Sequence, residues 1–276
     1  NLKNNFTRQD VGNLQRTGGT LNIMGTLDNT GQTLALDAAT GSWRLNDGTI
    51  LGGSLTTTDD ARLTASGRSG NRLVGVTLDG VLELSESSAR VRIADGLSVN
   101  GTVQMTTTSS LGFEGTQSLL GTGSVQFPTN GSTGFLESVG DGTTLTIGPE
   151  ITLQGGQGQL GGSFAWGGTM NVVNQGTILA ETANRTVTLS GRGDGATVDN
   201  QGTITVAGGI LELDSDWDNN ATLALQAGTL NLKNNFTRQD VGNLQRTGGT
   251  LNIMGTLDNT GQTLALDAAT GSWRLN

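Results

Sequence analysis

The residues of this chain best suited to chemistry are three aspartates at alternate positions, Asp214, Asp216 and Asp218. Alternating carboxylates open the calcium loop of EF-hand proteins, in which side-chain and backbone oxygens surround the ion. That loop also needs glycine at its sixth position and glutamate at its twelfth, where this chain has Asn219 and Leu225. We therefore predict a solvated acidic edge of a strand and keep calcium binding as the alternative. We assign no metal-binding and no cofactor-binding residue.

A second candidate is the tripeptide Arg192-Gly193-Asp194, which is the sequence that ligands of integrin receptors display. Glycine makes up 45 of the 276 residues, so a tripeptide with a central glycine arises readily by chance. We predict that it forms a corner between Leu189 and Val198, with receptor binding as the alternative.

Residues that could catalyse a reaction are scarce. Enzymes that cleave polysaccharides group carboxylates, often with a basic side chain, in a groove. This chain has no histidine, its only lysines are Lys3 and Lys233, and outside the Asp214 cluster its densest carboxylate pair is Asp59-Asp60. We therefore predict that the chain is not an enzyme and has no catalytic residue.

The composition excludes several classes of partner. The formal net charge is −9 and no cysteine is present, so an electrostatic interaction with nucleic acid or an anionic membrane is disfavoured. No apolar run approaches the length of a membrane span, so we expect no membrane insertion within this segment. The absence of cysteine also rules out disulfides and thiolate metal sites, and it suits a bacterial exported protein.

The strongest feature of the sequence is a long repeat. Residues 1–46 and 231–276 are identical. Constraints of folding cannot produce such identity, because surface positions tolerate many side chains. Self-similarity at a fixed period is typical of repeat architectures. We therefore predict a tandem array of 230-residue units.

A shorter period, the pattern Gly-x-apolar-x-apolar, lies within the long one. It recurs with glycine at positions 19, 41, 80, 101, 123, 142, 162, 209, 228, 249 and 271, with a one-residue slip at 142. Versions without glycine begin at Ala61 and Arg185 and fill the two gaps of double length. From position 41 to position 271 this makes eleven steps of about 21 residues, which predicts that eleven coils form one unit.

Each pattern alternates with a period of two, which is typical of a strand with one buried face. Helical spacing does not fit these runs. The expected inward pairs are Leu21/Ile23, Trp43/Leu45, Leu63/Ala65, Leu82/Leu84, Val103/Met105, Val125/Phe127, Leu145/Ile147, Phe164/Trp166, Val187/Leu189, Leu211/Leu213 and Leu230/Leu232. We expect equivalent positions to stack, with Trp43 between Ile23 and Leu63. Because Trp43, Trp166 and Trp273 are all assigned inward, few aromatic surfaces remain for sugars.

These patterns predict an all-β fold, a parallel β-helix with about 21 residues and three short strands per coil. Asn-Gly and Asp-Gly pairs mark the corners, because both residue types tolerate positive φ. We expect one continuous solenoid over residues 1–276, with about 13 coils and a length on the order of 60 Å. Pro128 and the run 131–134 predict a looped-out excursion within looser coils at 105–140.

The coils NQGTILAETANRTVTLSG (174–191) and VDNQGTITVAGGILELD (198–214) resemble the β-helical passenger regions of bacterial surface proteins. These include filamentous-haemagglutinin-like exoproteins, autotransporter adhesins and giant repeat adhesins. The resemblance covers the whole chain and concerns its architecture. It implies a right-handed, extracellular rod at a bacterial cell surface or in a secreted fibre, and it transfers no functional residue.

Two functions follow as hypotheses. The first is a structural repeat of an extracellular fibre or adhesin stalk, which gives reach and stiffness. Its partner would be more of the same chain, covalently continuous or stacked end to end, with an axial repeat of about 53 Å for eleven coils. The second is an adhesin module that binds glycans, other cells or a receptor through one solenoid face. The outward residues Asn22, Arg44 and Glu83 are too mixed for an ice-binding array.

Overall fold

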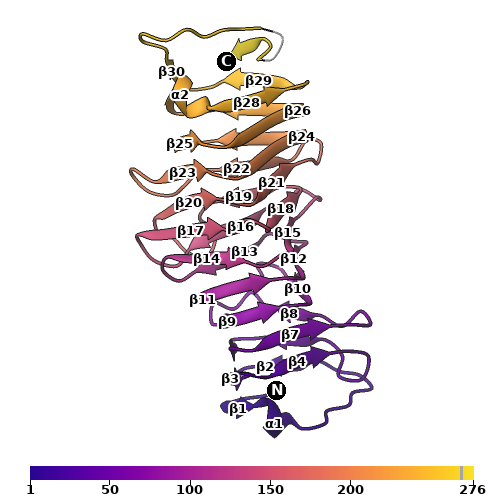
Figure 1. The fold of residues 1–276 in the computed structure, drawn as a ribbon. Coiled ribbons are helices and arrows are strands. Elements are labelled where there is room, and N and C mark those ends of the chain that lie inside the picture. Colours follow the sequence, from indigo (N-terminus) through magenta and orange to yellow (C-terminus); the bar gives the residue numbers. More distant parts are fainter. Residues whose placement is uncertain (268–269) are drawn as a thin grey trace.

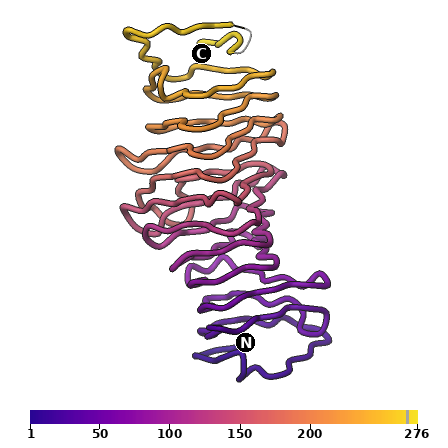
Figure 2. The backbone as a smooth tube through the Cα atoms, in the orientation of Figure 1, coloured from indigo at the N-terminus to yellow at the C-terminus, as the bar shows by residue number. Residues whose placement is uncertain are grey.

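The computed structural model describes residues 1–267 and 270–276, which wind into an elongated parallel β-solenoid. It has about 12 turns of roughly 22 residues each. Successive turns lie one above another, and the two termini lie at opposite ends of the rod (Figures 1 and 2). The predicted fold class is confirmed, and the observed coil length is close to the expected one.

The strands stack on three faces of the rod, which we name A, B and C. Face A consists of β2 (Leu21–Ile23), β5 (Trp43–Leu45), β8 (Leu63–Ala65), β10 (Val81–Leu84), β12 (Thr102–Met105), β15 (Ser124–Phe127), β18 (Thr152–Gly155), β21 (Thr177–Ala180), residues 203–206 of β24 (Thr203–Leu213), residues 222–225 of β26 (Thr222–Leu232), and β28 (Asn243–Arg246).

Face B consists of β1 (Asn5–Thr7), β3 (Thr26–Asp28), β6 (Thr49–Leu51), residues 72–74 of β9 (Arg72–Leu78), residues 90–94 of β11 (Arg90–Val99), β13 (Ser109–Phe113), β16 (Gly134–Ser138), β19 (Gly158–Leu160), β22 (Thr186–Leu189), residues 210–213 of β24, residues 229–232 of β26, β29 (Thr250–Ile253) and β31 (Trp273–Leu275).

Face C consists of β4 (Thr33–Leu36), β7 (Ser54–Thr57), residues 76–78 of β9, residues 97–99 of β11, β14 (Gln117–Leu120), β17 (Thr143–Ile147), β20 (Met170–Asn174), β23 (Thr197–Asn200) and β25 (Asp216–Asn219). A two-stranded sheet of β27 (Asn235–Thr237) and β30 (Thr256–Asp258) continues this face. The ring of Phe236 lies 5.2 Å from that of Trp217 on β25.

The core is a stack of aliphatic side chains at equivalent positions of successive coils. On face A, Leu82 pairs with Leu63 on one side and Val103 on the other, and all three are fully buried. Trp43 is also buried, but its neighbours are Leu21 and Leu63 rather than the expected Ile23. Parallel pairing in register explains this, since each side chain meets the residue in the same position of the next strand.

Glycine at the corners is required by the close approach of successive coils. A Cβ atom on Gly101 would lie 2.0 Å from the carbonyl oxygen of Gly80, and one on Gly123 would lie 2.2 Å from that of Gly101. No side chain fits at such distances. The pattern glycines at positions 80, 101 and 123 therefore mark corners where only bare backbone can stack.

Asparagine has a role at one corner that the sequence did not predict. Asn174 and Asn200 are buried at the ends of β20 and β23, and their backbone φ angles are not positive. The side-chain amide of Asn174 donates to Asn200 at 2.8 Å, Asn200 donates to Asn219 at 2.6 Å, and Asn219 donates to the carbonyl of Val241 at 2.9 Å. This asparagine ladder satisfies buried polar groups from coil to coil.

The expected pair Phe164/Trp166 is wrong, because neither residue lies in a strand or in the core. Residues 161–169, the outer excursion, leave the coil after β19 and return at β20, and Phe164 is 38 % exposed. The inward position on face B is filled by Leu160 instead. A period of two cannot distinguish a core strand from an extended segment that packs on the outside.

The expectation that eleven coils form one unit is also wrong. The sequence pattern lies on face A up to Val125, but its next copy, at position 142, forms β17 on face C. The following copy, at position 162, belongs to the outer excursion, and from Val187 onward the pattern lies on face B. The coil between Val125 and its partner Leu153 is longer than the average turn, as predicted near Pro128. The coil from Val103 to Val125 has the average length, so the looser region begins later than the predicted 105–140.

The two copies of the repeated stretch share most of their local structure but differ at two places. Residues 243–246 form β28 where residues 13–16 form no strand, and residues 33–36 form β4 where residues 263–266 form none. Each contains a helix of one turn that the sequence analysis did not predict, α1 (Arg8–Val11) and α2 (Arg238–Val241). Both helices have a capping box in which Thr7 or Thr237 and the aspartate three residues later bond reciprocally. Neither helix is long, and no helix in residues 1–267 and 270–276 has the length and apolar character of a membrane span.

The core assignment predicts that Leu84→Asp strongly destabilises the rod. Leu84 is fully buried and pairs with Met105 in the next coil, so an unpaired carboxylate there should lower the free energy of unfolding by about 3 kcal/mol or more. Chemical denaturation followed by circular dichroism measures this. Glu83→Asp places the same side chain one position earlier, on the outer side, and should change stability by less than about 0.5 kcal/mol. Equal effects of the two substitutions would contradict the inward assignment.

Candidate functional site

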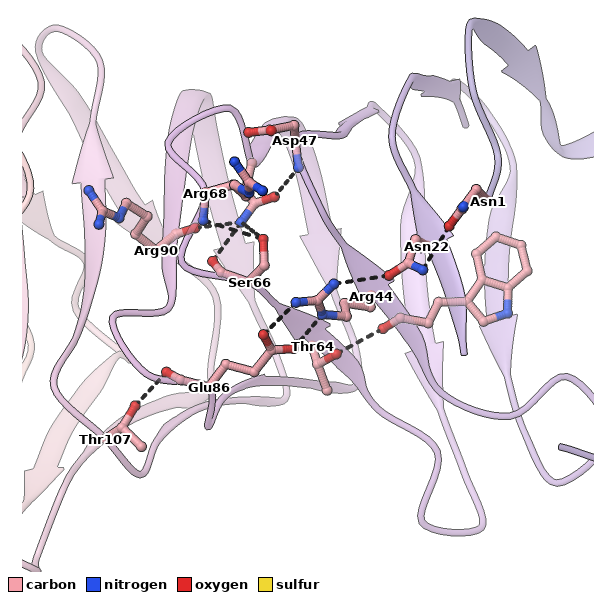
Figure 3. A network of polar contacts seen from close by, with 12 residues as sticks. Asn1, Asn22, Arg44, Asp47, Thr64, Ser66, Arg68, Glu86, Arg90 and Thr107 are labelled. Carbon is pink, nitrogen blue, oxygen red and sulfur yellow. Dashed lines mark hydrogen bonds and ion pairs between the residues drawn. The ribbon is translucent and has the colours of Figure 1, made fainter. Parts of the chain in front are cut away.

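A polar network covers the outer side of face A near the first copy of the repeat (Figure 3). Arg44 lies at its centre, where it donates to Asn22 at 3.1 Å and forms a two-pronged ion pair with Glu86, one branch of which measures 2.6 Å. The hydrogen bonds that Arg44 donates to Glu86 raise the pKa of Arg44. Glu86 is held in turn by Thr107, which donates to its backbone carbonyl at 2.8 Å. The network joins strands of different coils.

A shallow depression beside this network is lined by Arg16, Asn22, Ser42, Arg44, Thr64 and Glu86. Arg16 donates to the backbone carbonyls of Thr40, Ser42 and Gly19. The same bonds recur in the second copy, where Arg246 donates to Thr270, Ser272 and Gly249. Because these guanidinium groups donate to the chain's own carbonyls, they hold a corner of the chain in place. Their donors are engaged, so the depression is poorly suited to binding an anion.

A second ion cluster lies on the outer side of face B. Glu114 pairs with Arg72 at 2.6 Å and with Arg92 at 3.3 Å. Arg72 and Glu114 are 42 residues apart, the same separation as Arg44 and Glu86. In both pairs the arginine therefore reaches across one intervening coil, which couples three successive coils at each place.

The outer excursion is anchored by the buried carboxylate of Glu137. Glu137 lies on β16 and is completely inaccessible to solvent. Its oxygens accept the backbone N–H groups of Phe164 at 2.8 Å, Ala165 at 3.0 Å and Trp166 at 3.1 Å, and the hydroxyl of Ser110 also donates to it. Several donors on one carboxylate satisfy its charge without a cation.

Aromatic rings attach the same excursion to face B. The ring of Phe164 stacks on that of Phe135, with centroids 5.2 Å apart and planes inclined by 12°. Trp166 covers Gly112, where a Cβ atom would come within 2.4 Å of the indole ring. Phe164 is exposed and Trp166 is half-buried, so Trp166 lies outside the core, contrary to the sequence-based assignment. The rod therefore carries a small, rigid aromatic surface on its outside.

The tripeptide Arg192-Gly193-Asp194 forms the predicted corner, between β22 and β23. Arg192 exchanges two backbone hydrogen bonds with Met170, at 2.7 and 2.8 Å. Gly193 has a φ of 102° and its carbonyl accepts the N–H of Ala196. Asp194 is exposed. The tripeptide is thus a turn held by its first residue, and nothing in its geometry distinguishes it from a structural corner.

The predicted acidic edge is confirmed for Asp216 and Asp218, which lie exposed on β25. Asp214 is half-buried beside Lys233, with its carboxylate 3.5 Å from the Nζ atom. Burial raises the pKa of Asp218, and so do a hydrogen bond with Asp240 and the negative charges of Asp240, Asp199 and Asp216. Asp240 belongs to the second copy of the repeat, whereas Asp199, Asp216 and Asp218 precede it. This acidic cluster therefore lies where one 230-residue unit ends and the next begins.

The described residues contain no group of three or more histidine, cysteine, aspartate or glutamate side chains placed to hold a metal ion. The Asp59-Asp60 pair lies in the turn before β8, where both residues are exposed with φ angles of 51° and 61°. Asp60 and Arg62 approach to 3.5 Å, with the carboxylate fully exposed. Such a pair contributes little and is not enclosed as a catalytic pair would be.

Sequence reasoning missed the anchor of the outer excursion and the asparagine ladder. Glu137 had one available signal, which is a single acidic residue within the apolar run Gly134-Phe-Leu-Glu-Ser138. The ladder is signalled by the recurrence of asparagine at positions 174 and 200 before Gln-Gly. Both signals become meaningful only when the strands that stack on one another are known.

These features define the class of the protein as a parallel β-solenoid in which Arg16, Arg44 and Glu137 bind partners within the chain. Comparisons with protein-family models, with curated proteins and with solved structures find no match to this chain. Its function is therefore argued from its own geometry.

The anchor of the outer excursion predicts the effect of Glu137→Ala. This substitution leaves three backbone N–H groups without their acceptor, so we expect a loss of about 1–3 kcal/mol and faster proteolysis within 161–169. Limited proteolysis with mass spectrometry locates the cleavage. Glu137→Gln keeps one carbonyl acceptor and should have a smaller effect. Unchanged protease resistance in Glu137→Ala would contradict the anchoring role.

The acidic cluster predicts a pH-dependent effect of Asp218→Asn. The raised pKa of Asp218 means that its ionisation opposes folding, so this part of the stability is present at low pH and is lost as the pH rises through the pKa. Asp218→Asn should therefore stabilise the chain at neutral pH, by at most about 1 kcal/mol because the group is solvent-exposed. The two proteins should converge near pH 3, below the ordinary aspartate pKa of about 4.

Urea denaturation across this pH range measures the difference, and Asp216→Asn on the same strand is the matched control. Asp216 is exposed like Asp218, but it is Asp218 that hydrogen-bonds to Asp240, so the substitution of Asp216 should have a smaller effect. A stabilisation by Asp218→Asn that does not change with pH would show that charge repulsion is not its cause.

Proposed function

We propose that this chain is a structural segment of a bacterial extracellular fibre or adhesin stalk, in which 230-residue units follow one another along one rod. The single observation that carries the proposal is the identity of residues 1–46 and 231–276, combined with two strand pairs that have the same register in both copies. Leu21 pairs with Trp43 as Leu251 pairs with Trp273, and Asn5 pairs with Thr26 as Asn235 pairs with Thr256. Both copies are built to continue the same stack.

A parallel solenoid suits a stalk because its length increases without any change in the core. Each coil bonds only to the coils above and below it, so stability per coil is nearly independent of the total length. The ion pairs of Arg44 and Arg72 add connections between coils that are not adjacent. Reach and stiffness are the properties that such a design supplies.

An extracellular location is supported by composition and by resemblance. The chain has no cysteine to be oxidised, and its polar surface consists largely of threonine, asparagine, serine and glutamine. These are the features in which the coils 174–191 and 198–214 resemble bacterial surface proteins. A role without catalysis is supported by the polar clusters, since Arg16, Arg44 and Glu137 bind partners within the chain.

The test compares arrays of one, two and three units by negative-stain electron microscopy. Each added unit should lengthen a rod of constant width by about 50 Å, as expected for coils spaced at about 4.8 Å. Antibodies raised against one unit should label intact cells of the source organism. Compact particles whose length does not increase with the number of units would refute the stalk, and labelling only after permeabilisation would refute the extracellular location.

The outer excursion favours a second candidate, an adhesin module that binds glycans through one face of the rod. Phe135, Phe164 and Trp166 present aromatic surface outside the core, and aromatic rings are platforms on which sugars stack. A glycan array probed with one unit distinguishes this candidate. Saturable binding that Trp166→Ala abolishes would support the adhesin module. The absence of binding would leave the stalk as the proposed function.

A further inference from the structure

The two copies of the repeated stretch occupy different faces of the solenoid. In the first copy, Leu21 lies on β2 in face A, and the stack that begins there ends at Leu244 on β28. In the second copy, Leu251 lies on β29 in face B, above Leu230. Likewise Phe6 lies in face B, whereas Phe236 lies beside Trp217 of face C. The strands of the second copy that have a counterpart in the first, namely β27, β29, β30 and β31, are each displaced by one face.

The displacement follows from the number of strands in a unit. Between Leu21 and Leu251 the chain passes thirty-one strand positions, three to a coil, so one unit of the repeat makes ten and a third coils. This is two-thirds of a coil fewer than the expected eleven, and the difference arises between Val125 and Leu189. There the excursion after β15 and the outer excursion take up residues, so the chain makes only two and a third coils.

We propose that consecutive units of the array are rotated relative to one another by one face, so that only every third unit is in register. This proposal rests on the proposed function, because it requires the units to continue one rod. Three units then make 31 whole coils. The axial rise is on the order of 50 Å per unit and 150 Å for the full period, at a coil spacing of about 4.8 Å.

The repeated stretch can occupy either face because the following contacts are made within the copy itself and are therefore the same in both positions. Asn22 donates to Asn1 at 2.8 Å in the first copy, and Asn252 donates to Asn231 at 2.8 Å in the second. A Cβ atom on Gly25 or Gly255 would meet the carbonyl oxygen of Asn4 or Asn234 at 1.8 or 1.9 Å. The same corner therefore forms at different positions around the rod.

The consequence concerns the surface that the array offers to a partner. The outer excursion occurs once in each unit and projects from face B of its own unit. Rotation by one face per unit presents its aromatic surface on all three sides of the rod within three units.

One experiment tests the register on the single chain, which contains no cysteine. Gln126 on β15 lies next to Gln154 on β18, and neighbouring parallel strands are close enough for a disulfide. Gln126→Cys with Gln154→Cys should therefore form an intramolecular disulfide on oxidation with diamide, seen as a gel-mobility shift and a loss of two hydrogens in mass.

The control pair is Gln126→Cys with Thr146→Cys. An eleven-coil unit would place Val125 beside Leu145 and hence Gln126 beside Thr146, whereas in the structure Thr146 lies on face C beside Ser118 and Val173. No disulfide should form in this pair. Circular dichroism confirms that both variants fold. A disulfide in the control pair and none in the first pair would overturn the proposal.

A second experiment observes the rotation itself in a six-unit array by cryo-electron microscopy at a resolution that separates strands. The expected map repeats after three units, with the outer excursion on successive faces. A map that repeats after every unit, with the excursion always on one face, would overturn the proposal while the stalk stands. A failure of the array to form rods would instead refute the proposed function, and the disulfide test would remain decisive for the register.

Discussion

The parallel hydrogen bonding between successive coils is the constraint on which the rest of this structure depends. A strand in face A, B or C has no partner within its own coil, so its backbone groups are satisfied only by the coils above and below. The spacing of coils is therefore fixed, and side chains at one position form a continuous stack such as Leu63, Leu82 and Val103. Corners must be equally compact, which explains the glycines at positions 80, 101 and 123.

The fold was predictable from sequence because this constraint leaves a periodic trace. Alternation of apolar residues identified one inward pair in each predicted coil, such as Leu82 and Leu84, and all of these pairs except Phe164/Trp166 are buried. The inward positions on the other two faces, such as Leu27 and Leu34, were not assigned. The error at Phe164 and Trp166 has a physical cause, since both rings pack on the outside of the rod, against Phe135 and Gly112, so their apolar character reflects contacts outside the core. Counting that segment as a coil also gave the wrong number of coils per unit.

The surface features were predictable only where they are local. The corner at Arg192-Gly193-Asp194 and the outward direction of Asp216 and Asp218 follow from alternation and glycine content alone. The anchoring of the excursion by Glu137 and the meeting of Asp218 with Asp240 do not, because each joins residues far apart in sequence that lie in different coils. Such contacts depend on which strands stack, and that register changes wherever an excursion lengthens a coil.

The arginines that reach across an intervening coil determine how the rod resists tension. Arg44 binds Glu86, Arg72 binds Glu114, and the guanidinium of Arg185 donates to the carbonyl of Thr129, 56 residues earlier. At these three places a coil cannot peel from its neighbour without also separating from the coil beyond it. An axial pull that separates two neighbouring coils at these places must therefore also break a side-chain contact to the coil beyond, so the load there is shared by three coils.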